Sequence, residues 1–249
     1  MRSDQVSPPR RYSLHHRIDA RPSVVTAPGL SEERQLLAEG HRRVAGLDEV
    51  GRGAWAGPVT VGVAMMRPGA TERSIPAWLR DSKLLSEARR EGIFVPVGTW
   101  CDAWAIGHAS PEECDALGMA AALRLAAERA LAGLPDPPDA LLIDGPVNLL
   151  GRAAGPFHGV VRPVKGGDTR CASVSAASVL AKVVRDRLMR GESDHFPPYG
   201  FERNKGYPSR AHQAALRGYG LSAIHRRSWS YVQNLPWSAG GSARGQNPR

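Results

Sequence analysis

Apolar and polar positions along the chain follow two periods, which predict where strands and helices lie. Short apolar, β-branched runs predict strands over residues 44–50, 58–66, 103–108, 140–144 and 160–164. Helical spacing and capping residues predict helices over residues 31–41, 110–133, 173–190 and 209–218. Two strands in succession, followed by strand–helix–strand units, predict an α/β fold with a mixed sheet flanked by helices.

Local signals predict the ends of three helices. Ser110 and Glu113 have the spacing of a capping box, with Pro111 at the first helical position. Ser209 is predicted to cap the last helix, and Gly191 to end the helix before it as a left-handed cap. The order of elements fits several α/β folds equally, so fold alone does not decide function.

Composition and charge indicate the class of partner. The chain has 249 residues and 42% hydrophobic content, enough for one well-cored domain. We expect that domain at 29–237, between a disordered basic leader at 1–28 and a disordered tail at 238–249. The formal net charge of +9 makes nucleic acid the expected partner, although surplus arginine also serves solubility.

The cysteines and the apolar runs indicate the compartment. Cys101, Cys114 and Cys171 contain no Cys-x-x-Cys pair, which argues against a disulfide framework and a zinc knuckle and fits a reducing cytoplasm. No run approaches the ~18 apolar residues of a membrane span, and no apolar segment of a secretory signal follows the N-terminal arginines. We therefore expect a cytoplasmic protein without a membrane partner. We also expect a monomer.

Acidic residues stand where predicted strands end. Asp48 and Glu49 lie at the end of the first strand, Asp144 ends the fourth, and Asp168 follows the fifth. Each has an ordinary alternative: Asp48 and Glu49 could be a solvated pair in a turn, Asp144 could belong to an Asp-Gly turn, and Asp168 could be a loop residue. Buried carboxylates are costly unless they are paired or metal-bound, and Mg²⁺ and Mn²⁺ prefer carboxylate ligands. Together, in a basic protein, these acids indicate metal-assisted hydrolysis of a phosphodiester.

The adjacent acids raise a geometric question. Strand alternation sends Asp48 and Glu49 to opposite faces of the sheet. Both can serve one site only if the strand kinks or a bulge intervenes, which the glycines that follow permit.

An ordered series of motifs carries a resemblance to a known family. The segment VAGLDEVGRG at 44–53 closely resembles the opening signature of ribonuclease HII. Further matches follow in the family's order: DSKLLS at 81–86, IDG at 143–145, KGGD at 165–168, SAASVLAK at 175–182 with Arg185-Asp186, YGF at 199–201, KGYP at 205–208 and HRRSW at 225–229. The resemblance spans about residues 31–232, nearly the whole chain outside the tails.

This resemblance implies a fold and an activity. The fold would be a ribonuclease H-like α/β domain with a C-terminal helical extension. The activity would be hydrolysis of the RNA strand of RNA/DNA hybrids and incision at single ribonucleotides in duplex DNA, leaving 3′-hydroxyl and 5′-phosphate ends. The cofactor would be Mn²⁺ or Mg²⁺, which activates the attacking water.

The resemblance also implies the site residues. The catalytic set is Asp48, Glu49, Asp144 and Asp168, of which the first three bind metal and the last holds metal or orients water. The substrate-binding set is Gly51, Arg52, Gly53, Lys182, Lys205 and Tyr207. The glycines would let backbone amides and carbonyls approach the ribose. Ordinary alternatives are a solvated cation for Lys182, surface charge for Lys205 and loop packing for Tyr207.

Departures from the family's pattern are few. Leu84 stands where the family usually has a second lysine, Asn204 where it has a histidine, and Pro146 where asparagine is common. An additional Gly167 makes the alignment of Asp168 with the family's fourth acid the least secure of the four. None of these changes removes a carboxylate.

Other functions stay open at this point. The sibling ribonuclease HIII usually carries an extra folded N-terminal domain. A non-catalytic RNA/DNA-binding module would have no use for acids beside its phosphate path. The +9 charge argues against a metal-dependent phosphatase of small substrates. Residues 233–237, QNLPW, faintly resemble a sliding-clamp-binding peptide, although packing of an apolar segment on the domain is the favoured alternative.

Overall fold

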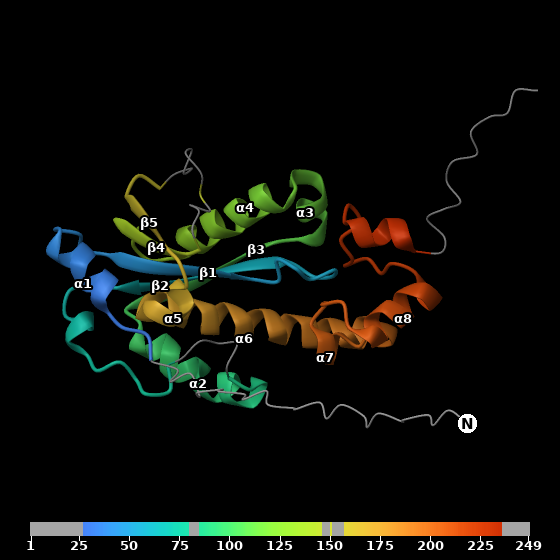
Figure 1. Cartoon of the computed structure of the whole chain (residues 1–249), viewed down its shortest axis with the longest axis horizontal. Coiled ribbons are helices and arrows are strands. Elements are labelled where there is room, and N and C mark those ends of the chain that lie inside the picture. Colours follow the sequence, from blue (N-terminus) through green and yellow to red (C-terminus); the bar gives the residue numbers. More distant parts are fainter. Residues whose placement is uncertain (1–26, 80–84, 146–149, 151–156, 236–249) are drawn as a thin grey trace, which may run out of the picture.

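The computed structural model describes residues 27–79, 85–145, 150 and 157–235. Within these residues, five strands form one sheet in the order β3–β2–β1–β4–β5 (Figure 1). They are β1 (Val44–Val50), β2 (Val59–Met66), β3 (Ala103–Ala109), β4 (Ala140–Asp144) and β5 (Val160–Val164). β2 pairs antiparallel with β1 and β3, whereas β4 runs parallel to β1 and β5. The predicted mixed sheet is therefore confirmed, and its first two strands form an antiparallel hairpin.

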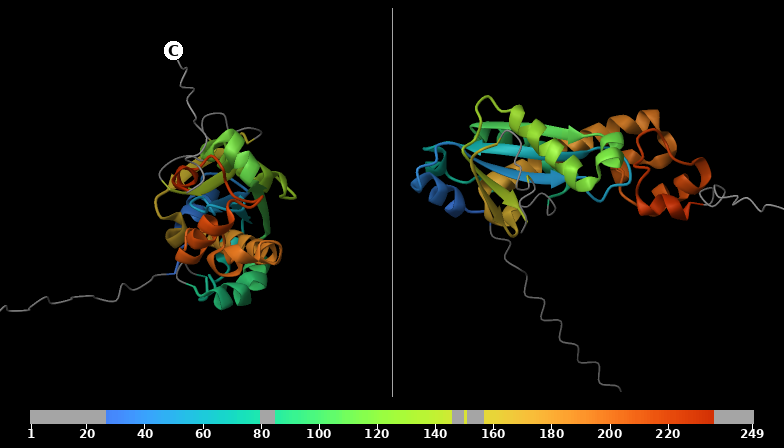
Figure 2. Two further views of the ribbon diagram at one scale, coloured as in Figure 1. Left: turned by 90° about the vertical axis from the view of Figure 1, so that its right-hand side faces the viewer. Right: turned by 90° about the horizontal axis from the view of Figure 1, so that it is seen from above.

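Helices cover both faces of this sheet. They are α1 (Ser31–Ala38), α2 (Glu87–Trp100), α3 (Pro111–Leu117), α4 (Met119–Ala132), α5 (Gly167–Arg170), α6 (Ala172–His195), α7 (Phe201–Asn204) and α8 (Arg210–Tyr219). α3 and α4 lie on one face, and α6, backed by α2, lies on the other (Figures 1 and 2). α7 and α8 continue past the end of the sheet with a 3-10 turn at Ser230–Asn234, which forms the expected C-terminal helical extension.

Apolar side chains fill the space between these layers. One core lies between the sheet and α4 and includes Leu47 and Leu123. A second core lies between the sheet, α6 and α2 and includes Met66 and Val179. α6 can approach β1 closely because Gly46 has no side chain, since a Cβ there would lie 2.3 Å from a backbone nitrogen of α6. The close approach sets one face of α6 against the end of β1 that carries the acidic pair.

Two predicted helix boundaries are wrong. The helix expected over 110–133 is divided into α3 and α4 at Gly118, whose φ of 77° cannot continue a right-handed helix. Gly191 does not cap α6, which continues through it to His195. A glycine inside a helix costs only ~1 kcal/mol, whereas Pro197 disfavours helical backbone at the residue before it. The capping box at Ser110 and the N-cap at Ser209 are confirmed.

The sequence pattern did not predict α2. This helix contains Pro96 and buries only Val97 fully, so it lacks a clear apolar stripe, and its packing against α6 stabilises it. α5 and α7 are also short helices in segments predicted as loops. The expected tail at 238–249 and nearly all of the expected leader at 1–28 lie outside the described residues. No helix in the described ranges is long and apolar enough to cross a membrane.

Candidate active site

A cavity of about 260 Å³ opens at the end of β1. Its walls come from the end of β1 and the turn after it, the end of β4, α6 and the loop after α7. The lining residues are Asp48, Glu49, Val50, Gly51, Arg52, Gly53, Asp144, Ser178, Lys182 and Tyr207. The structure therefore brings together all but two of the site residues named from the sequence, the exceptions being Asp168 and Lys205.

The end of β1 delivers Asp48 and Glu49 to this one cavity without a bulge. Pairing with β2 continues in regular register through both residues, to Gly62 and Val61. Pairing with β4 stops earlier, at Leu47. The two acids therefore stand where β1 has lost its neighbour on one side, and the cavity occupies that open edge. The bulge considered from the sequence is not present in the β1–β2 ladder.

Asp48 lies in an environment that disfavours a negative charge. The residue is 5% exposed, and burial raises the pKa of its carboxyl to about 7, although a hydrogen bond with Ser178 opposes the shift. Three nearby carboxylates add to it: Glu49, Asp144 and Asp168. Burial also raises the pKa of Glu49, which the Arg52 guanidinium, 3.6 Å away, lowers in part. A hard cation bound among these oxygens would relieve their mutual repulsion.

Asp144 and Asp168 come from neighbouring elements. Asp144 ends β4, and its carboxylate accepts a hydrogen bond of 2.7 Å from the amide of Gly167 at the start of α5. Asp168 is 5% exposed, and its negative charge helps to raise the pKa of Asp48. It does not line the cavity. Among the described residues, no three His, Cys, Asp or Glu side chains are already arranged to hold a metal ion.

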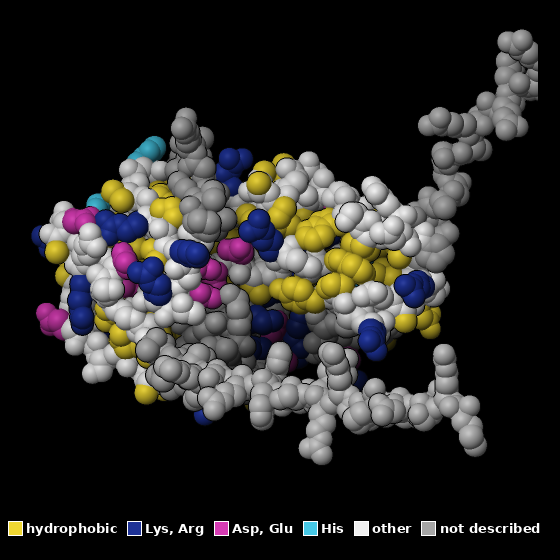
Figure 3. Space-filling model, viewed as in Figure 1, with side chains coloured by type: hydrophobic (Ala, Val, Ile, Leu, Met, Phe, Trp, Pro, Cys, Tyr) yellow, Lys and Arg dark blue, Asp and Glu magenta, His cyan; other side chains and the backbone are white. Residues whose placement is uncertain are grey.

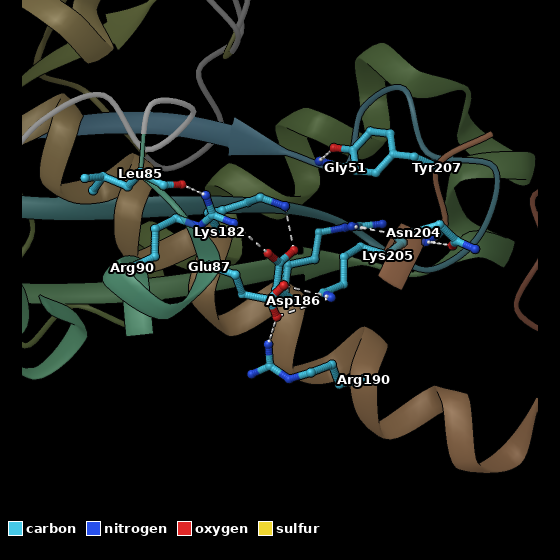
Figure 4. Close-up of polar contacts among 12 residues, drawn as sticks. Gly51, Leu85, Glu87, Arg90, Lys182, Asp186, Arg190, Asn204, Lys205 and Tyr207 are labelled. Atoms are coloured by element: carbon cyan, nitrogen blue, oxygen red, sulfur yellow. Dashed lines mark hydrogen bonds and ion pairs between the residues drawn. The ribbon is translucent and has the colours of Figure 1, made fainter. Parts of the chain in front are cut away.

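The turn after β1 is built from glycines for steric reasons. Gly51 has a φ of 83°, and a Cβ on it would lie 2.2 Å from Nε of Arg185. Its amide donates a hydrogen bond of 3.1 Å to the hydroxyl of Tyr207 (Figure 4). The Tyr207 ring centroid lies 5.5 Å from the Arg185 guanidinium and 5.9 Å from Nζ of Lys182. Tyr207 thus contacts the turn through its hydroxyl and lies close to two cations.

The two predicted phosphate-binding lysines differ in position. Lys182 lines the cavity, and its Nζ lies 2.6 Å from Oδ1 of Asp186, a buried carboxylate (Figure 4). Burial lowers the pKa of Lys182, and the Asp186 carboxylate opposes that shift. Lys205 is only 4% exposed, and its Nζ lies 3.3 Å from the Glu87 carboxylate of α2. The structure therefore directs the ammonium of Lys205 toward α2 and not into the cavity.

Comparison with known proteins identifies the family. Residues 45–232 match the family model of ribonuclease HII. The chain belongs to the ribonuclease HII family. Ribonuclease HII of Streptomyces coelicolor is 50% identical over 210 residues, which cover 84% of this chain and 86% of that protein. Ribonuclease HII of Paracoccus denitrificans is 46% identical over 209 residues, which cover 84% and 94%.

Solved structures agree with this assignment. Ribonuclease H2 from Pyrococcus horikoshii OT3 aligns with a TM-score of 0.67 at 27% identity over 80% of this chain and all of that one. A Bst-RNase HIII solved in complex with Mn²⁺ aligns with a TM-score of 0.60 at 20% identity over 77% of this chain and 68% of that one, a likeness of fold alone. The chain is thus a ribonuclease HII, an endoribonuclease of the ribonuclease H class, whose family uses divalent metals.

Three further residues at or behind the cavity were not indicated by the sequence. Ser178, a small residue of α6, lines the cavity and hydrogen-bonds Asp48. Arg185 and Arg226 are fully buried. All three lie in segments that match the family's motifs. An arginine is usually exposed, so the sequence of a basic chain gives no signal that these two are buried.

One face of the molecule shows an uneven distribution of side chains (Figure 3). Acidic and basic side chains gather over the half that contains α1, β4 and β5, whereas hydrophobic side chains dominate the half toward the C-terminal extension. A hollow lies between the two halves, with basic side chains visible inside it. Charged side chains of both signs are therefore spread unevenly over this face.

Proposed function

We propose that the cavity at the end of β1 hydrolyses the RNA strand of RNA/DNA hybrids and incises at single ribonucleotides in duplex DNA. The products would carry 3′-hydroxyl and 5′-phosphate ends. The observation that supports this proposal is the convergence of three carboxylates with a glycine turn, Lys182 and Tyr207 on one cavity. Acids alone would repel a phosphodiester, so their presence beside substrate-binding groups favours a metal-assisted nuclease over a binding module.

The proposed metal ligands are Asp48, Glu49 and Asp144, with Mg²⁺ or Mn²⁺ as the cation. The donor set consists of carboxylate oxygens, which hard divalent cations prefer. When bound, the cation supplies a Lewis acid that activates water and stabilises the leaving oxygen. Ser178 would orient Asp48, and the Gly167 amide would orient Asp144. The position of Asp168 outside the cavity lining favours a role in orienting the water or the other carboxylates.

The proposed reader of the ribonucleotide is the Gly51–Gly53 turn with Tyr207. A 2′-hydroxyl is the only chemical mark of a ribonucleotide within DNA, and it both donates and accepts hydrogen bonds. The Tyr207 hydroxyl accepts from the Gly51 amide, which leaves its own proton available to a ligand. Lys182 would contact a backbone phosphate from the cavity wall, with Asp186 holding its ammonium in place. The position of Lys205 favours a structural role for that residue.

Two further expectations about partners remain proposals. Ribonuclease HII of Archaeoglobus fulgidus has been solved as a complex with PCNA, at 24% identity to this chain. In this chain Leu235 is only 8% exposed, which favours packing of this leucine on the domain, whereas Pro236 and Trp237 lie outside the described residues. A monomer located in the cytoplasm remains our expectation.

The test is a panel of duplexes with one labelled strand. The wild-type protein should cleave an RNA/DNA hybrid and a DNA duplex with one ribonucleotide in Mg²⁺ or Mn²⁺, and it should leave all-DNA duplex intact. The products should be substrates for a ligase or phosphatase that requires a 5′-phosphate. Cleavage in EDTA, or products with 5′-hydroxyl ends, would refute the proposed chemistry.

A further inference from the structure

Two arginines are fully buried behind the glycine turn. Arg226, which follows α8, and Arg185, from the middle of α6, both have 0% exposed area. Neither forms an ion pair within the described part of the chain, and the hydrogen bonds of both guanidiniums go to backbone carbonyl oxygens. A buried cation is costly, so two of them in one place call for a physical reason.

Arg226 binds the turn itself. Its Nη2 donates to the carbonyl oxygen of Gly51 at 2.7 Å, and its Nη1 donates to that of Arg52 at 3.1 Å. Its Nε donates to the carbonyl of Gly57 at 3.1 Å. One rigid guanidinium therefore fixes two consecutive peptide groups of the turn and the segment that returns from it.

Arg185 supports the neighbouring backbone. Its three donors reach the carbonyl oxygens of Pro58 at 2.9 Å, Lys205 at 2.9 Å and Ala56 at 3.1 Å. Lys205 lies two residues before Tyr207, so Arg185 links the segment after the turn to the loop that carries the tyrosine. The two arginines thus fix the position of the turn relative to the loop that carries Tyr207.

This arrangement decides which backbone groups face the cavity. In a trans peptide the carbonyl and the next amide point in opposite directions. The carbonyls of Gly51 and Arg52 point inward to Arg226, so the amides of Arg52 and Gly53 point away from it. Neither amide has an acceptor among the residues that the structure describes, and a Cβ on Gly53 would meet nothing within 4 Å. The turn therefore offers donors to a ligand, and its carbonyls are occupied, contrary to the expectation that both would contact the sugar.

We propose that Arg226 is a positioning residue that determines which backbone groups of the Gly51–Gly53 turn face the ribonucleotide. It holds two carbonyls inward so that the amides of Arg52 and Gly53 can donate to the 2′-hydroxyl oxygen of the ribonucleotide. This inference rests on the proposed function of the turn. Lysine cannot replace the arginine, because its ammonium is a single point of charge and the guanidinium is a planar fork that spans both carbonyls.

The test is binding without catalysis. Fluorescence anisotropy in EDTA gives Kd for a DNA duplex with one ribonucleotide and for the same duplex without it, for wild type and Arg226→Lys. We expect the wild-type preference for the ribonucleotide to fall roughly tenfold in the variant, which corresponds to ~1.4 kcal/mol. Affinity for the all-DNA duplex should change little, because phosphate contacts supply it.

A control separates positioning from loss of stability. Leu123→Ala removes a buried side chain of the core under α4, so it lowers the melting temperature without touching the turn. It should keep the wild-type preference, with all measurements made well below the lowest melting temperature. An unchanged preference in Arg226→Lys, or an equal loss in Leu123→Ala, would overturn the inference. Failure of the proposed function would be seen earlier, as wild type without any preference for the ribonucleotide.

A second measurement needs no variant. Hydrogen exchange of the Arg52 and Gly53 amides in wild type should be fast in the free protein, because neither has an acceptor. Both should become protected by the duplex with one ribonucleotide, and much less by the all-DNA duplex. Equal protection by the two duplexes would overturn the assignment of these amides to the 2′-hydroxyl, whether or not Arg226→Lys folds.

Discussion

Replacing Asp48 with asparagine should stabilise the metal-free protein while it removes the response to metal. Burial and three neighbouring carboxylates raise the pKa of Asp48 from 3.8 to about 7. The folded state therefore holds a proton that the unfolded state releases, and the free energy of unfolding falls as pH rises from about 4 to about 7. At 1.36 kcal/mol per pKa unit, the full penalty is about 4 kcal/mol at pH 8. Asparagine avoids this penalty because it has almost the same shape and no charge.

The assay is urea unfolding in EDTA at pH 5 and pH 8, with Asp136→Asn as a matched control. Asp136 lies on the surface beside Arg67, with half of its side chain exposed, so loss of its charge should change the free energy of unfolding little. The stability advantage of Asp48→Asn over wild type should grow by about 2–3 kcal/mol between the two pH values. Adding Mn²⁺ at about 100 times its Kd should stabilise wild type by ~2.7 kcal/mol and Asp48→Asn much less.

Two results would refute this reasoning. If Asp48→Asn is no more stable than wild type in EDTA at pH 8, the carboxylate is not under the electrostatic penalty that its burial implies. If Mn²⁺ stabilises both proteins equally, Asp48 is not a ligand of the metal. The first result concerns burial and the second concerns the metal site, so the two can be told apart.

The remaining predictions concern the substrate groups and the C-terminal extension. Tyr207→Ala should reduce kcat/KM on a single-ribonucleotide duplex more than on a continuous hybrid. Tyr207→Phe leaves the Gly51 amide without its acceptor but should lose less activity than Tyr207→Ala. An equal loss of kcat/KM by Tyr207→Ala on both substrates would indicate that the ring serves packing alone. Lys182→Met should weaken duplex binding and reduce its salt dependence by about one phosphate contact, which salt titrations of Kd would test. Lys205→Met should lower the melting temperature and leave the salt dependence of binding unchanged. Burial lowers the pKa of His225 from 6.5 to about 3, so stability should fall as pH drops below about 6.5, and His225→Gln should flatten this fall in acid unfolding curves.

The strands were predictable from sequence because each is a short apolar run bounded by turn residues. β1, β4 and β5 have the predicted bounds. α2 was not predictable, because its packing against α6 holds it despite an internal proline. Gly191 shows the same limit, since a local helix-ending signal was overridden by the continuous packing of α6.

The acids of the site were predictable, but their supports were not. Asp48, Glu49 and Asp144 stand at strand ends that the apolar pattern marks, and the structure brings them to one cavity. The buried position of Lys205 depends on α2, more than 100 residues earlier in the chain. The carbonyls that Arg226 binds lie about 170 residues away, and backbone carbonyls carry no sequence signal.

The central claim is that the cavity at the end of β1 is the metal-dependent site of RNA cleavage. Single-turnover cleavage of a DNA duplex with one ribonucleotide, in Mn²⁺, tests it most directly when wild type is compared with Asp144→Asn. We predict that the variant loses roughly 10³-fold or more in rate, about 4 kcal/mol in the transition state, while its Kd for the duplex stays within a few-fold of wild type. A variant that cleaves like wild type, or one that loses binding and keeps its rate on bound substrate, would contradict the assignment of the site.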